Sequence, residues 1–84
     1  MTPTTATLLA QLLHEIGFPA GVFNVVHGTG LSAGQPLIEH PLVSAVSFTG
    51  GTVTGAIVAS SAGRTFKKLS LELGGKNPNV IFAG

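Results

Sequence analysis

The sequence predicts an α/β fold, part of a parallel sheet with flanking helices, and three observations lead to it. Segments with helical spacing alternate with short apolar runs in the order α-β-α-β-α-β. The apolar runs are nearly continuous in Val, Ile, Leu and Phe, which is typical of parallel strands covered by helices. Each run ends in glycines, so tight turns are expected at the carboxyl ends of the strands.

The first helix is predicted over residues 2–16. Thr2 suits the N-cap, and Pro3 suits the first helical position, where its missing N–H costs nothing. An apolar stripe at helical spacing follows, made of Leu8, Leu9, Leu12, Leu13 and Ile16. Gly17 supplies a left-handed C-cap and Pro19 prevents continuation, so the helix is expected to end there.

The later elements follow from the apolar runs and the residues that interrupt them. Strands are expected at 22–26, 42–48 and 66–73, a fourth strand is expected to begin at 79–82, and helices are expected at 32–39 and 52–62. His40-Pro41 is expected to stop the second helix, because the residue before a proline avoids the helical region. Gly63 is expected to cap the third.

The composition excludes several classes of protein. Charged residues are 8%, against about 25% in typical soluble proteins, which predicts a piece of a larger domain whose faces other segments cover. A net charge of +1 and the absence of Tyr and Trp argue against nucleic-acid binding. The uncharged stretch 41–63 suggests a membrane span, but its hydroxyl residues and Gly50-Gly51 argue against one. No secretory signal is visible, so a cytoplasmic location is expected.

Two glycine-rich turns are candidate phosphate-binding segments. Residues 28–34 form GxGxxxG after an apolar run, close to a dinucleotide fingerprint, but the acidic residue expected about twenty positions later is missing. A turn that lets a helix and a strand pack closely is an equal alternative. Residues 48–51, Phe-Thr-Gly-Gly, leave a strand and enter a helix whose first N–H groups suit a phosphate. A tight turn without a ligand explains this spacing equally well.

Residues 69–76, Leu-Ser-Leu-Glu-Leu-Gly-Gly-Lys, are the most informative run. The leucines alternate with Ser70 and Glu72, so Glu72 points to the opposite face at the carboxyl end of a strand. A carboxylate that loses hydration beside a covered sheet becomes a better general base near neutral pH. The alternative, a half-exposed strand with a solvated polar face, is favoured by the alternation alone.

No metal site or nucleophile is predicted. His14, His27 and His40 lie on different elements, and His14-Glu15 lacks the second histidine of a zinc-binding helix. The sequence has no Cys, which excludes thiolate metal ligands and disulfides.

Several runs together resemble the NAD(P)-dependent aldehyde dehydrogenase superfamily. They are residues 17–28, His40-Pro41, residues 48–51 with Gly55, and Leu71-Glu72-Leu73-Gly74-Gly75-Lys76-Asn77-Pro78. The resemblance covers nearly the whole chain in matching order and approximate spacing. It implies that residues 1–84 are an internal part of the cofactor-binding domain, a Rossmann-like sheet, up to and just past the strand with the general base.

The resemblance also implies site residues. Glu72 matches the general base, which helps to activate the catalytic thiol and the hydrolytic water. The remaining matches are to cofactor contacts: Gly30 and Gly34 near the adenosine, Gly50, Gly51, Thr54 and Gly55 at the pyrophosphate, and the backbone of Leu73 at the nicotinamide. Gly51 departs from the family, in which most members have Ser. The catalytic Cys is expected beyond Gly84.

The implied reaction is oxidation of an aldehyde to a carboxylic acid with NAD through a Cys thioester, with NADP as the alternative cofactor. The parent protein is expected to be a homo-oligomer, and the 84-residue piece alone is expected to be inactive. The other possibility is a truncated, non-catalytic module that binds a nucleotide or packs against a partner. Residues 67–73 and Asn77-Pro78 are similar to dehydrogenases of muconic semialdehydes.

Overall fold

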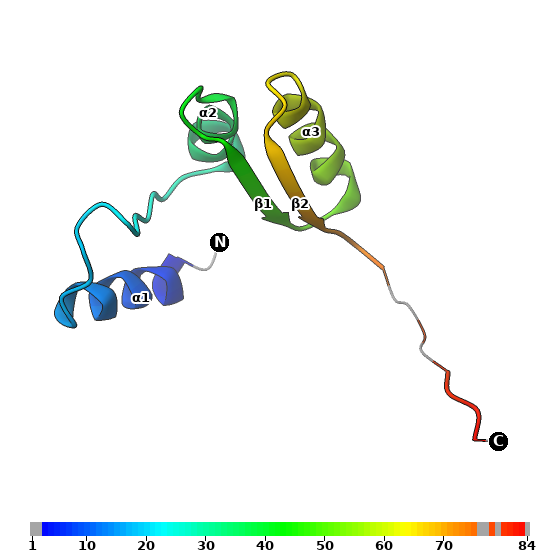
Figure 1. Ribbon diagram of the computed structural model, residues 1–84, viewed down its shortest axis with the longest axis horizontal. Coiled ribbons are helices and arrows are strands. Elements are labelled where there is room, and N and C mark those ends of the chain that lie inside the picture. The colour runs from blue at the N-terminus through cyan, green and yellow to red at the C-terminus, as the bar shows by residue number, and fades with distance from the viewer. Residues whose placement is uncertain (1–2, 76–77, 79, 84) are drawn as a thin grey trace. The chain divides into compact units, whose positions relative to one another are not determined.

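The computed structural model describes residues 3–75, 78 and 80–83 (Figure 1). The chain forms two compact units, residues 1–34 and 35–84.

The first unit begins with helix α1, Pro3–Glu15. Its carboxyl end confirms the predicted cap: Gly17 has a φ of 77°, its N–H donates to the His14 carbonyl at 3.1 Å, and the Phe18 N–H donates to the Leu13 carbonyl at 2.9 Å. This pair of bonds is a Schellman motif, in which a left-handed residue satisfies the last carbonyls of a helix. The expected N-cap, Thr2, lies outside the described residues.

The strand predicted at 22–26 is wrong. The chain turns at this point, because Gly21 has a φ of 84° and the Val22 N–H donates to the Pro19 carbonyl. The Asn24 side-chain amide donates to the Gly21 carbonyl at 2.8 Å, a local bond that competes with a strand ladder. Among the described residues no strand pairs with this segment. An apolar run alone was therefore not enough to predict a strand.

The helix predicted at 32–39 is confirmed, but it begins earlier and in a different form. Residues Gly30–Gly34 form a π-helical turn (η1), and α2, Gln35–Glu39, follows directly and ends before His40-Pro41 as expected. The hydroxyl of Thr29 explains the early start, since it accepts the Ser32 N–H at 3.1 Å. The Gly34 N–H then reaches the Thr29 carbonyl, five residues back.

The second unit contains a parallel β-α-β arrangement, which confirms the predicted fold class. Strand β1, Ala45–Thr49, leads into α3, Thr52–Gly63, and then into β2, Lys68–Glu72. The two strands pair in parallel, with Ala45 opposite Lys68 and Thr49 opposite Glu72. Figure 1 shows α3 running back alongside the two strands. Both strands are shorter than predicted.

One face of this small sheet packs on α3. Val46 and Phe48 are the half-buried residues of β1, and they lie in register with Leu69 and Leu71 of β2, on the same face. The helix presents its buried residues to this face: Gly55, Val58 and Ala62. Their spacing of three and four places them on one side of α3. The other face of the sheet carries the small and polar residues.

The end of α3 corrects another prediction. Gly63 is the last helical residue and not a left-handed cap, and the residue with positive φ is Phe66, at 53°. The Lys67 N–H donates to the Ala62 carbonyl and the Phe66 N–H to the Gly63 carbonyl. These are again the bonds of a Schellman motif, shifted three residues later and built on a phenylalanine.

The predicted fourth strand is absent: Val80–Phe82 show no strand, and Asn79 lies outside the described residues. In the part of the chain that the structure describes, no helix is long and apolar enough to cross a membrane.

Candidate functional site

The carboxyl edge of the two-stranded sheet joins two of the segments singled out in the sequence. Thr49 and Glu72 are register partners at the last position of the strands. One step further, the Gly50 N–H donates to the Glu72 carbonyl at 3.0 Å. The glycine turn after β1 and the acidic end of β2 are therefore neighbours at the edge where ligands bind in open α/β sheets.

The amino end of α3 opens at the same edge. Its N-cap is Gly51, with φ −69° and ψ 148° and no side-chain cap bond. The first bond of the helix runs from the Gly55 N–H to the Gly51 carbonyl at 2.9 Å. The N–H groups of Thr52, Val53 and Thr54 precede that bond, so they are the donors that a helix start offers to an anion.

The glycines at this edge differ in the space available for a side chain. A Cβ on Gly50 would lie 2.6 Å from Cζ of the Phe48 ring, and a Cβ on Gly55 would lie 3.0 Å from Cδ1 of Leu73. A side chain at either position would therefore force the Phe48 ring or the Leu73 side chain to move. A Cβ on Gly51 would meet nothing within 4 Å, so space is open at the N-cap of α3. The Phe48 ring beneath Gly50 was missed in the sequence, where only its position before the glycines hinted at it.

Glu72 lies on the sheet face opposite α3. Its neighbours Leu71 and Leu73 belong to the other face, since a Cβ on Gly55 of α3 would contact Leu73 and strand residues alternate. The Glu72 side chain is exposed. The loss of hydration expected from the sequence is therefore not provided within the described residues.

The eight residues implied as site residues divide between the two units. Six of them lie in the second unit around one sheet edge: Gly50, Gly51, Thr54, Gly55, Glu72 and Leu73. Gly30 and Gly34 bound η1 in the first unit. A Cβ on either would meet nothing within 4 Å, so packing within that unit does not require glycine there. In the described part of the chain, no group of three His, Asp or Glu residues is arranged to hold a metal ion.

A comparison with protein-family models identifies the family of the chain. The model of the aldehyde dehydrogenase family matches residues 1–84. The chain belongs to the aldehyde dehydrogenase family. The resemblance inferred from the sequence is thereby confirmed.

Over the segment that aligns, curated members of the family are about half identical to this chain. The 2-aminomuconic semialdehyde dehydrogenase of Danio rerio is 54% identical over 83 residues, which is 99% of this chain and 17% of that protein. The phenylacetaldehyde dehydrogenase of Pseudomonas fluorescens is 52% identical over 82 residues, which is 98% of this chain and 16% of that protein. The chain thus spans only a small part of the relatives it matches.

Solved structures of similar proteins contain a segment with a similar fold. A mutant aldehyde dehydrogenase C from Pseudomonas syringae, complexed with NAD+ and octanal, matches 93% of this chain and 16% of its own, with 46% identity and a TM-score of 0.87. An NADP-dependent enzyme from E. coli matches 88% of this chain and 15% of its own, with 47% identity and a TM-score of 0.85.

Proposed function

We propose that the protein containing this chain oxidises an aldehyde to a carboxylic acid with NAD+, and that this chain supplies part of the cofactor site and the general base. The Gly50 N–H to Glu72 carbonyl bond carries the proposal, because it brings a helix start and a carboxylate to one sheet edge. The family match over all 84 residues and the NAD+ complex of the Pseudomonas syringae relative support it. NADP+ is the alternative cofactor, as in the E. coli relative.

The residues at the sheet edge fit a dinucleotide. The N–H groups at the start of α3, from Thr52 to Thr54, form a donor set suited to a pyrophosphate. Gly50 and Gly51 let the backbone approach it without a side chain in the way. By resemblance, Gly30 and Gly34 contact the adenosine, Thr54 and Gly55 belong to the pyrophosphate segment, and the Leu73 backbone holds the nicotinamide. The bound cofactor supplies the hydride acceptor.

Glu72 is proposed to take the proton from the water that hydrolyses the acyl thioester. The thiol that forms this thioester must come from another segment of the protein, because these 84 residues contain no Cys. Glu72 is exposed in this chain, so we propose that other segments cover it and remove water from the carboxylate. Such desolvation strengthens a carboxylate as a general base.

The proposed substrate class is a muconic semialdehyde. Residues 67–73 support it, as does the 54% identity to the Danio rerio enzyme, although the phenylacetaldehyde enzyme is almost as similar. A kcat/KM at least tenfold higher for a muconic semialdehyde than for phenylacetaldehyde would support this class, since tenfold is about 1.4 kcal/mol of transition-state preference. Equal values would reject it.

Glu72→Gln in the whole protein tests the general base. A general base contributes roughly 10²- to 10⁴-fold, so we expect steady-state turnover to fall by that factor. The first equivalent of reduced cofactor should still form, because hydride transfer precedes hydrolysis. Glu15→Gln, the same chemical change at an exposed residue of α1, should leave turnover unchanged.

The outcomes test the role of Glu72 separately from the dehydrogenase activity. Unchanged turnover in Glu72→Gln would remove Glu72 from the mechanism. Failure of the unmodified protein to reduce NAD+ or NADP+ with any aldehyde would reject the proposed function. The 84-residue chain alone should produce no reduced cofactor with aldehyde, since it lacks a thiol.

A further inference from the structure

Gly55 forms a notch in α3 that holds the side chain of Leu73. Gly55 is buried, and a Cβ there would lie 3.0 Å from Cδ1 and 3.3 Å from Cγ of Leu73, with Cδ2 closer still. The leucine side chain therefore occupies the space that any other residue at position 55 would fill. Contacts this short are incompatible with a methyl group unless Leu73 moves.

The notch lies where it can fix the end of β2. Leu73 directly follows Glu72, the last residue of the strand. The Glu72 carbonyl accepts the Gly50 N–H at 3.0 Å, so residues 72 and 73 are held from two sides, by β1 through the hydrogen bond and by α3 through the notch. Leu73 is itself 38% exposed, which means that the described residues leave its side chain room to swing out if the notch closes.

The burial of Gly55 separates it from its neighbours in the glycine turn. Gly50 and Gly51 are exposed at the sheet edge, where a ligand can reach their backbone. Gly55 faces the sheet beneath Leu73, so packing within this unit accounts for its burial.

We propose that Gly55 is a positioning residue, whose missing side chain seats Leu73 against α3 and thereby fixes the backbone that carries Glu72. Its effect on the cofactor is indirect. The catalytic consequence rests on the proposed function of Glu72, whereas the notch itself is independent of it.

A double-mutant cycle in the whole protein tests this inference. Gly55→Ala and Leu73→Ala break the same contact from its two sides, so each should lower kcat by roughly tenfold, with the aldehyde KM nearly unchanged. The kcat of the double variant should stay within about twofold of the kcat of the less active single variant, because the effects of substitutions at contacting residues do not add independently. Gly63→Ala is the matched control, as it lies on the same helix with nothing within 4 Å of the new Cβ.

Hydrogen exchange supplies a readout that does not require activity. The Gly50 amide, bonded to the Glu72 carbonyl, should exchange about tenfold faster in Gly55→Ala and in Leu73→Ala, and unchanged in Gly63→Ala. This result would support the notch even if the whole protein oxidised no aldehyde, an outcome that would reject only the proposed function.

Two results would overturn the inference. The first is a loss of kcat in the double variant equal to the product of the two single losses, together with weaker NAD+ binding in Gly55→Ala but not in Leu73→Ala. That pattern is expected of a direct cofactor contact. The other is a Gly55→Ala protein that matches Gly63→Ala in both kcat and Gly50 exchange.

Discussion

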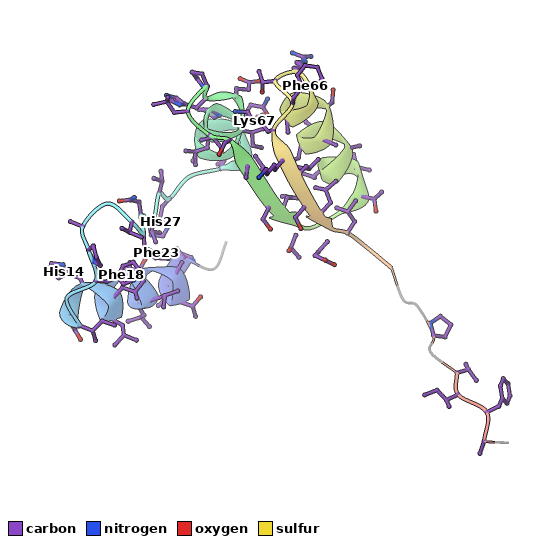
Figure 2. All side chains as sticks on the ribbon, in the orientation of Figure 1. His14, Phe18, Phe23, His27, Phe66 and Lys67 are labelled. Atoms are coloured by element: carbon purple, nitrogen blue, oxygen red, sulfur yellow. The ribbon has the colours of Figure 1, made fainter. Side chains whose placement is uncertain are left out.

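The two ends of the β1–α3–β2 unit are built in different ways. At the carboxyl edge of the sheet, Gly50 and Gly51 leave the backbone bare, and the helix start has no side-chain cap. At the amino edge, the Lys67 ammonium donates to the His40 carbonyl at 2.6 Å and to the Val43 carbonyl at 2.5 Å. Figure 2 shows Phe66 and Lys67 at this second end.

This difference indicates which end of the unit can bind a ligand. At the amino edge, the Lys67 side chain satisfies two backbone carbonyls, those of His40 and Val43. The carboxyl edge keeps its helix N–H groups for another molecule. Four substitutions test this contrast, each measured in the whole protein.

The largest effect on stability is expected at the amino edge, from Lys67→Met. Two charge-assisted bonds to carbonyls are lost, and bonds to charged groups are worth about 1.5–3 kcal/mol each. We expect the free energy of unfolding in urea to fall by about 2–4 kcal/mol. Cofactor affinity of the folded protein should not change. Lys68→Met, at the exposed first residue of β2, should stay within about 0.5 kcal/mol of the parent. Equal losses of unfolding free energy in Lys67→Met and Lys68→Met would show that the bonds to the His40 and Val43 carbonyls do not account for the loss.

Gly50→Ala should damage the carboxyl edge. The new Cβ would lie 2.6 Å from Cζ of Phe48, and overpacking of this kind costs about 1–3 kcal/mol. Calorimetry should show weaker NAD+ binding by roughly tenfold, because the turn before α3 is displaced. Gly63→Ala is the control, since its Cβ meets nothing within 4 Å and it lies at the other end of α3. Equal loss of NAD+ binding in the two variants would show that the contact with Phe48 does not explain the effect.

Phe66→Gly should stabilise the amino edge. Phe66 has a φ of 53° and is 96% exposed, so its side chain is strained without packing in return. The left-handed conformation costs a non-glycine residue about 1–2 kcal/mol, and the flexibility of glycine in the unfolded chain offsets part of the gain. A rise of about 1 kcal/mol in unfolding free energy is expected. Thr65→Gly, one residue earlier and without positive φ, should destabilise instead.

The smallest effect is expected from Gly51→Ser at the bare helix start. The N-cap backbone is already extended, and a serine hydroxyl there would cap α3 for a few tenths of a kcal/mol more than glycine. The same hydroxyl would lie beside the proposed pyrophosphate. A modest rise in melting temperature together with tighter NAD+ binding would support that placement. Tighter binding without stabilisation would mean that the hydroxyl serves the cofactor and not the helix.

The two helix ends show where sequence reasoning succeeded and where it failed. At Gly17 the glycine marked the left-handed position, and the structure confirms it. At the end of α3 the glycine at 63 suggested the same role, but the chain continued to Phe66 before reversing. The Lys67 N–H donates to the Ala62 carbonyl, and β2 begins at the next residue, Lys68, in register with Ala45.

Local sequence patterns were enough to predict the helix-strand alternation from residue 35 onward, the parallel β-α-β class, the helix ends at Gly17 and His40-Pro41, and the family. These depend on local patterns: helical spacing, apolar runs, glycines and prolines. Only the tertiary structure decided that the run at 22–26 pairs with no described strand, because a strand exists only with a partner. It also decided that Gly55 is filled by Leu73, a contact between residues eighteen positions apart that no local pattern encodes.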